Sequence, residues 1–220
     1  MSKKNPFKSF LVVTVLLVSY VGVTCVFYDL DSQRKDRVQL RQLDTGAYDV
    51  SSLSSSNRKA FKVISNKLSH TKIARPDLLA AIITFESEAR GVDPLFVTAI
   101  IFRESTFNHK AVSKVGARGL MQLLPTTARY IAQKEGLEWK GADALFQPAY
   151  NIRLGIAYLQ YLQNGFNNKP RLALMAYNWG PGNLKGALAK NISPYTSVKN
   201  YAEKVMVTYE SLKGFVLERA

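Results

Sequence analysis

Glu104 is the residue whose type and position most favour chemistry. It lies four residues after Ile100 and three before Phe107, which places it on the apolar face of a helix that Asp93 and Pro94 open. A carboxyl group on an apolar face resists ionisation, so the pKa of Glu104 is expected to rise. A raised carboxyl pKa suits a general acid that works near neutral pH. The pattern therefore favours acid-catalysed cleavage or elimination.

A second interpretation keeps Glu104 out of the chemistry. If the helix ends near Ser105, Glu104 becomes a solvated residue of the last turn. No partner carboxylate stands out, because Glu135, Glu138 and Asp143 lie in a polar stretch and are expected to be solvated. Glycoside cleavage usually uses two carboxyl groups. A mechanism with one acid therefore needs a group on the substrate to replace the second carboxylate.

The composition argues against metal, cofactor and nucleic-acid chemistry. One cysteine, Cys25, and two histidines, His70 and His109, leave too few ligands for a thiolate or imidazole metal site. The GPG stretch at 180–182 follows a helical pattern and lacks the tail of a phosphate-binding loop. The net charge of +14 favours an anionic partner. However, Lys and Arg are spread along the chain and match no nucleic-acid-binding module. We therefore expect no metal ion, no cofactor and no nucleic acid.

The elements that must position Glu104 are predicted to be helices. Apolar residues recur at helical spacing from residue 58 onward, and no stretch alternates as a strand would. Prolines at 76, 94, 125, 148 and 170 indicate helix starts, and the GPG stretch at 180–182 indicates a stop. The last helix is expected to begin near Ser197 and to end at Gly214. The fold class is therefore expected to be all-α.

The first part of the chain is expected to be a membrane anchor and a tether. Residues 10–28 carry no charge and follow three lysines, and at about 1.5 Å per residue they nearly match a hydrocarbon core of roughly 30 Å. The predicted organisation is a transmembrane helix at 1–28, a flexible linker at 29–57 and a helical domain at 58–220. A cleaved signal peptide or lipidation at Cys25 remain alternatives.

Four motifs, in order, resemble the catalytic domain of the soluble lytic transglycosylase family over about residues 89–212. The match implies a lysozyme-like helical fold. The motifs are RESxFN at 103–108 with GARGLMQLxPxTA at 116–128, then Pro148 with Asn151, Ile152, Gly155, Tyr158 and Leu159, then AYNxGPGN at 176–183, and finally Tyr201 with Val205.

This resemblance implies a specific reaction on the glycan strands of peptidoglycan. Glu104 would protonate the oxygen that bridges N-acetylmuramic acid and N-acetylglucosamine. It would then act as base toward the muramyl C6 hydroxyl, which closes a 1,6-anhydro ring without consuming water. The nucleophile would lie within the sugar, and this would explain why no second carboxylate is evident.

The resemblance also implies which residues contact substrate. Met121 and Phe107 fit the core as well as the cleft, and core packing is the alternative for Tyr201, which matches the tyrosine that hydrogen-bonds the acid. Trp179 stands where the family commonly has a small residue, so it either stacks on a sugar ring or packs against a neighbouring helix. The expected substrate-binding residues are Ser105, Met121, Gln122, Tyr177, Asn178 and Tyr201.

The expected location agrees with this substrate. The anchor would make a single pass through the cytoplasmic (inner) membrane and place the domain on the periplasmic side, where peptidoglycan lies. The basic charge suits a wall rich in carboxylates, and association with an envelope protein complex is left open. Two other functions remain: a hydrolytic muramidase that admits water, and a non-catalytic peptidoglycan-binding scaffold of an envelope complex.

Overall fold

A computed structural model describes residues 48–217, and this part of the chain is helical. It contains no strand; two isolated antiparallel bridges join Val112 to Arg118 and Arg118 to Leu123. The expected all-α class is confirmed for these residues. The elements are η1 (Val50–Ser52), α2 (Ser55–Ser69), α3 (Pro76–Glu88), α4 (Pro94–Ser105), α5 (Pro125–Lys134), η2 (Asp143–Phe146), α6 (Pro148–Gly165), α7 (Pro170–Trp179), α8 (Pro181–Ala189) and α9 (Thr196–Leu217).

Proline begins each of the α-helices from α3 to α8. It fits the first turn because its φ is already near the helical value and its missing amide hydrogen would have no partner there. In α4, the side chain of Asp93 adds a cap by accepting a hydrogen bond of 2.8 Å from the amide of Leu95. The helix starts predicted at prolines 76, 94, 125, 148 and 170 are confirmed.

The end of the chain differs from its expected pattern at two glycines. Gly180, at φ +90°, ends α7, but Pro181 begins α8 at once, so the expected stop lasts one residue. Proline favours the first turn of a helix, and Pro181 therefore starts a new helix directly after Gly180. Gly214 does not end α9, which continues to Leu217. An interior glycine costs a helix only about 1 kcal/mol relative to alanine, and packing of the rest of α9 outweighs this.

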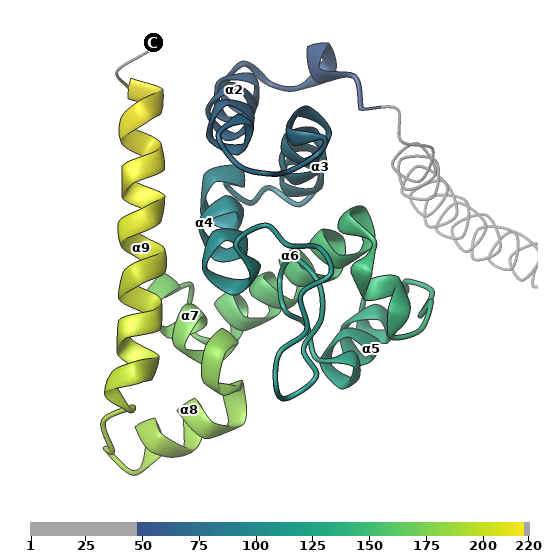
Figure 1. Cartoon of the computed structure of the whole chain (residues 1–220). Coiled ribbons are helices and arrows are strands. Elements are labelled where there is room, and N and C mark those ends of the chain that lie inside the picture. The colour runs from purple at the N-terminus through teal and green to yellow at the C-terminus, as the bar shows by residue number, and fades with distance from the viewer. Residues whose placement is uncertain (1–47, 218–220) are drawn as a thin grey trace, which may run out of the picture. The chain divides into compact units, whose positions relative to one another are not determined.

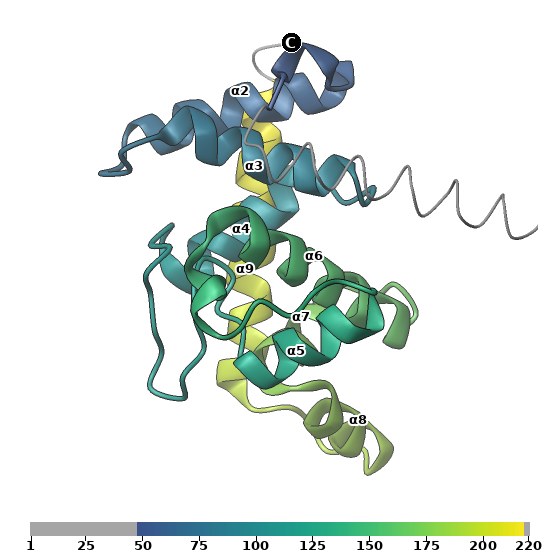
Figure 2. The ribbon, with the colours of Figure 1, turned by 90° about the vertical axis from the view of Figure 1, so that its right-hand side faces the viewer.

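The long helix α9 runs along one side of the folded unit and packs against α4 and α7 (Figures 1 and 2). On the other side of α4, helix α3 packs against both α2 and α6. α9 thus brings the end of the chain back to the end of α4, where Glu104 lies. This arrangement makes possible a site shared between residues far apart in the sequence.

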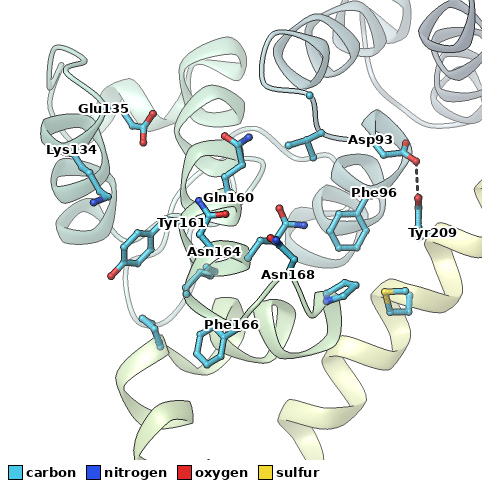
Figure 3. Close-up of a pocket in the computed structure, with 18 of the residues that line it drawn as sticks. Asp93, Phe96, Lys134, Glu135, Gln160, Tyr161, Asn164, Phe166, Asn168 and Tyr209 are labelled. Atoms are coloured by element: carbon cyan, nitrogen blue, oxygen red, sulfur yellow. Dashed lines mark hydrogen bonds between the residues drawn. The ribbon is translucent and has the colours of Figure 1, made fainter.

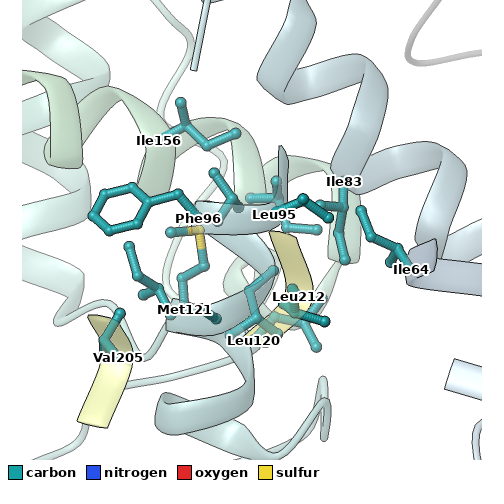
Figure 4. Packing of buried hydrophobic residues seen from close by; sticks show 14 of the residues in the cluster. Ile64, Ile83, Leu95, Phe96, Leu120, Met121, Ile156, Val205 and Leu212 are labelled. Carbon is teal, nitrogen blue, oxygen red and sulfur yellow. The ribbon is translucent and has the colours of Figure 1, made fainter. Parts of the chain in front are cut away.

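Two apolar clusters form the core, and α6 belongs to both. One cluster joins α2, α3, α4 and α9 and includes Ile64, Ile83, Leu212 and the fully buried Met121 (Figure 4). The other joins α5, η2, α6, α7 and α8. Side chains on different faces of α6 belong to the two clusters. The helix therefore fixes the two groups of helices relative to each other.

A buried ion pair joins α3 to α6. The guanidinium of Arg153 donates two hydrogen bonds to Glu86, from Nη2 to Oε1 at 2.9 Å and from Nε to Oε2 at 3.1 Å. Both side chains are nearly inaccessible, with 6% and 2% exposure. The bidentate geometry offsets part of the cost of removing both charges from water. Glu86 is therefore a structural residue that joins α3 to α6.

The folded unit begins earlier than residue 58. Leu53 is buried, and the hydroxyl of Ser54 caps α2, so residues 48–57 of the expected flexible linker belong to the folded unit. The burial of Leu53 and the cap formed by Ser54 hold this stretch in place, although its polar composition predicted a flexible linker. The expected transmembrane helix lies outside the described residues. Within residues 48–217, no helix combines the length and apolarity that a membrane crossing requires.

Candidate active site

Glu104 lies in the last turn of α4 and is only partly exposed. The helix ends at Ser105, as the second interpretation of the sequence supposed, but Glu104 is not solvated there. Burial raises the pKa of Glu104 to about 7, and a hydrogen bond from Tyr201 and the charge of Arg103 oppose this only in part. Both protonation states are therefore populated near neutral pH. A group that first donates and later accepts a proton needs this property.

Tyr201 of α9 donates a hydrogen bond from its hydroxyl to Oε1 of Glu104. The ring of Tyr201 is only 7% exposed and belongs to the core cluster, so the residue packs in the core and holds the acid at the same time. Burial and the neighbouring Glu104 raise the pKa of Tyr201 well above its usual value. The phenol therefore stays protonated and remains a donor, which fixes the orientation of the carboxyl group.

The loop between α4 and α5 is held in place by Asn151, a fully buried residue of α6. Its side-chain oxygen accepts a hydrogen bond of 2.8 Å from the amide of Met121, and its Nδ2 donates to the carbonyls of Arg118 at 3.0 Å and Leu145 at 2.9 Å. Gly119, at φ +77°, lies so close that an added Cβ would be 2.1 Å from the Leu145 carbonyl oxygen. One amide side chain therefore sets the position of the loop.

Met121 contributes to the site through its backbone and not through its side chain. The side chain is fully buried, and a Cβ added to Gly155 would lie 2.3 Å from its sulfur. The side chain therefore packs in the core, which is the alternative that the sequence left open, because α6 has no side chain at Gly155 and the thioether fills that space. The carbonyl of Met121 accepts a hydrogen bond of 2.8 Å from the hydroxyl of Tyr177.

Gln122 has a positive φ of 47°, a conformation that non-glycine residues seldom adopt. Its side-chain nitrogen donates to the carbonyls of Gly119 at 2.8 Å and Ala111 at 3.1 Å. Both hydrogens of the amide are thus committed to the loop. Its side-chain oxygen is the part of the group that can accept a hydrogen bond from a ligand.

A cavity of about 400 Å³ brings together four of the expected site residues: Glu104, Gln122, Tyr177 and Asn178. Trp179 also lines it. Ser105 does not line this cavity, because its hydroxyl donates back to the Ile101 carbonyl within α4 at 3.2 Å. Tyr201 lies behind Glu104 and contacts the acid rather than the cavity. The structure therefore separates the expected residues into those that face the cavity and those that support it.

The roles of several residues of the site were not expected from the sequence. The role of Asn151 had a detectable signal, because an amide within a strongly apolar helix needs buried partners. Tyr158 also lines the cavity, its ring lies 5.2 Å from that of Tyr177, and burial raises its pKa to about 12. Ser113 and Thr127 line the cavity as well, but hydroxyl residues in polar stretches carry no such signal.

A larger cavity of about 840 Å³ lies elsewhere, between the start of α4, the end of α6 and the middle of α9 (Figure 3). Asp93, Phe96 and Gln160 line it, and Tyr209 donates to Asp93 at 2.7 Å across its edge. Glu104 is not part of this cavity. The smaller cavity is the better candidate, because it holds the carboxyl group whose pKa is raised to about 7. Among residues 48–217, no three His, Cys, Asp or Glu side chains gather as metal ligands would.

Comparison with known proteins agrees with this geometry. The chain is 30% identical over 132 residues to the soluble lytic murein transglycosylase of Salmonella typhimurium, a match that covers 54% of this chain and 20% of the relative. It is 47% identical over 81 residues to the endo-type membrane-bound lytic murein transglycosylase A of Klebsiella pneumoniae, covering 35% of this chain and 39% of that protein. The chain thus spans about a fifth to two fifths of the length of these relatives.

Solved structures show the same fold. An inactive Glu-to-Gln mutant of lytic transglycosylase Slt from Pseudomonas aeruginosa matches with a TM-score of 0.57 and 27% identity, over 76% of this chain and 31% of that one. The 70 kDa soluble lytic transglycosylase of Escherichia coli matches with a TM-score of 0.58 and 23% identity, over 74% and 31%. The model of the transglycosylase SLT domain matches residues 81–200, which include Glu104 and the cavity. This chain belongs to the transglycosylase SLT domain family.

Proposed function

We propose that this chain is a peptidoglycan lytic transglycosylase that cleaves the β-1,4 bond between N-acetylmuramic acid and N-acetylglucosamine. Membership of the SLT family and the names of the curated relatives support this proposal. The observation that carries it is a cavity with a single carboxyl group, Glu104, whose pKa is raised to about 7. No other Asp or Glu of the described residues lines that cavity.

In this mechanism Glu104 acts twice. It first donates its proton to the bridging oxygen, and the bond between that oxygen and muramyl C1 breaks. The C6 hydroxyl of the same muramyl residue attacks C1, and the Glu104 carboxylate takes the hydroxyl proton. A 1,6-anhydro ring forms, no water is consumed, and Glu104 ends protonated. The nucleophile comes from the substrate, so the second carboxylate of ordinary glycosidases is not needed.

Other residues would bind and orient the reacting groups. Tyr201 would keep one carboxyl oxygen occupied, so that the other faces the substrate. Gln122 would accept a hydrogen bond through its free side-chain oxygen, and Asn178 is exposed toward the same cavity. Tyr177 would contact substrate with its ring while its hydroxyl holds the loop through Met121.

The products of digestion test this proposal. Purified peptidoglycan is digested with the full 220-residue chain, and the masses of the released muropeptides are measured by mass spectrometry. Lytic transglycosylase activity gives ends that are lighter than reducing ends by one water. Only reducing ends would instead identify a hydrolytic muramidase, and binding without cleavage would identify a scaffold. Glu104→Gln should reduce cleavage by at least about 100-fold; unchanged cleavage would refute the assignment of the acid.

We also propose that residues 1–28 anchor the domain to the inner membrane with its site on the periplasmic side. The uncharged run at 10–28, its basic flank and the membrane-bound relative support this proposal. After carbonate extraction of cell membranes, the full chain should stay in the pellet, and a chain that starts at Tyr48 should not. Protease added to spheroplasts should digest the domain. Release of the full chain, or protection of the domain, would refute the anchor or its orientation.

A further inference from the structure

Trp179 occupies the boundary between the core and the cavity that holds Glu104. It is the last residue of α7, packs on one side against the second apolar cluster, and lines the cavity on the other. Its backbone is fixed, because its carbonyl accepts a hydrogen bond of 2.7 Å from Asn183 of α8. The indole is therefore a partly exposed aromatic group on a rigid support, which is what a preorganised binding surface requires.

Tyr195 extends this surface beyond the residues that line the cavity. Its ring lies 5.2 Å from that of Trp179 at an interplanar angle of 66°, an edge-to-face arrangement. The ring is 67% exposed and belongs to neither apolar cluster, so core packing does not account for its position. The Tyr195 carbonyl accepts hydrogen bonds from the amides of Val198 and Lys199, which fixes it to the start of α9.

The chemistry of this pair suits a sugar ring. One side of a pyranose presents C–H groups with slight positive charge, and the face of an aromatic ring carries negative charge. In an edge-to-face pair the edge of one ring covers at most one face of the other, so each ring keeps an open face for a ligand. Asn178, exposed beside Trp179, offers an amide to the hydroxyl or acetamido groups at the edge of such a sugar.

We propose that Trp179 and Tyr195 form a saccharide-binding subsite that holds an N-acetylhexosamine ring of the glycan strand at a distance from the bond being cleaved. This subsite rests on the proposed function for its substrate class, but its own prediction concerns binding. The subsite stabilises the bound glycan strand equally in the ground state and in the transition state. Its loss should therefore raise KM and leave kcat nearly unchanged.

Binding is measured without catalysis in Glu104→Gln. The chain has two tryptophans, and Trp139→Phe leaves Trp179 as the sole indole reporter. Glycan strands freed of their peptides are titrated into this double variant of the full chain. A saturable change in Trp179 emission is expected, and adding Tyr195→Ala should weaken binding roughly tenfold. Binding that leaves Trp179 emission unchanged would overturn the proposal.

Activity gives the second measurement. Trp179→Ala and Tyr195→Ala should each raise KM for peptidoglycan roughly tenfold with kcat within about threefold, and Trp179→Phe should restore most of the loss. The control is Tyr130→Ala, which removes a 49% exposed ring from another edge-to-face pair, with Tyr161, outside the cavity. Equal KM values for all variants, or an equal rise for Tyr130→Ala, would overturn the subsite.

The two proposals can fail separately. If the wild-type chain releases no anhydro ends while glycan strands still change Trp179 emission, the reaction is wrong and the subsite stands. If anhydro ends form but the aromatic variants match the wild type in KM and binding, the subsite is wrong and the reaction stands. Thermal unfolding of each variant shows whether a loss of binding comes from a loss of folded protein.

Discussion

The hydroxyl of Tyr201 donates a hydrogen bond to Glu104, although 97 positions separate the two residues in the sequence. The bond depends on the packing of α9 against α4. The same two helices are joined again at the start of α4, where Tyr209 in the middle of α9 donates to Asp93 at 2.7 Å. One of these phenols supports the acid and the other supports a helix cap, so the pair provides a test with a built-in control.

Tyr201→Phe should change the pH dependence of cleavage as well as its rate. In the wild type, the hydrogen bond from Tyr201 lowers the pKa of Glu104. Its removal should therefore raise that pKa above its present value of about 7. Because the first step needs protonated Glu104, the alkaline limb of the pH–rate profile should move to higher pH. Looser positioning of the acid should lower kcat by roughly tenfold.

Tyr209→Phe is the matched control for this substitution. It also removes one phenol hydroxyl that links α9 to α4. Each of the two substitutions should lower the free energy of unfolding by roughly 0.5–1.5 kcal/mol. The pH–rate profile should stay that of the wild type. A profile that moves equally in both variants would show that Tyr201 acts on stability alone.

The raised pKa of Glu104 should make the folded protein less stable as pH rises. The folded state holds the Glu104 proton up to about pH 7, whereas the unfolded chain releases it near 4.5. Between these values the folded state binds more protons, so the free energy of unfolding falls as pH rises from about 4.5 to about 7. The full effect is at most about 3 kcal/mol.

Glu104→Gln removes this dependence. Relative to the wild type, the variant should gain stability at pH 8 and show little gain at pH 4, where Glu104 is protonated in both states. Urea unfolding of both proteins at the two pH values measures the difference. If the gain at pH 8 is no greater than at pH 4, the pKa of Glu104 is not raised in the folded protein.

Two glycines of the loop between α4 and α5 should respond differently to alanine. Gly116 and Gly119 both have positive φ, at 81° and 77°, but nothing lies within 4 Å of a Cβ added at Gly116. Gly116→Ala should cost about 1 kcal/mol for backbone conformation alone. Gly119→Ala adds a collision with the Leu145 carbonyl and Asn151, so it should cost more than about 3 kcal/mol and also lower activity. Equal unfolding free energies for the two variants would contradict this account of the loop.

The buried pair Glu86–Arg153 should be needed as a pair. Arg153→Met leaves a buried carboxylate without its partner and should cost roughly 3–5 kcal/mol in free energy of unfolding. Adding Glu86→Leu should restore much of this stability. The exposed pair Arg171–Glu203 is the control, because Arg171→Met there should cost less than about 1 kcal/mol. Denaturant unfolding of the variants measures all three effects.

The sequence predicted the helices well because their signals are local. Proline at a helix start and apolar residues at helical spacing act within a few residues, and Glu104 was found in the same way. The raised pKa follows from its apolar neighbours, and the structure agrees. The bond from Tyr201 was expected only through a family resemblance, since no local pattern relates residues on α4 and α9.

What could not be predicted depends on packing in three dimensions. The side chain of Met121 entered the core because Gly155 leaves space for it on a different helix. An amide in the apolar helix α6 indicates that Asn151 has buried partners, but only the folded chain shows which three backbone groups they are. The contact between Trp179 and Tyr195 depends on how α8 returns the chain to the start of α9. None of these relationships is visible in the spacing of residues.

The order of Glu104 and Tyr201 along the chain also sets the order in which the site is assembled. A ribosome releases the chain from its N-terminus, so α4 and Glu104 emerge long before α9. Until α9 has been made and has packed, Glu104 lacks its hydrogen-bond partner Tyr201 and the helix that covers one side of α4. The hydrogen-bonded acid is therefore complete only after α9 has been synthesised and has packed against α4.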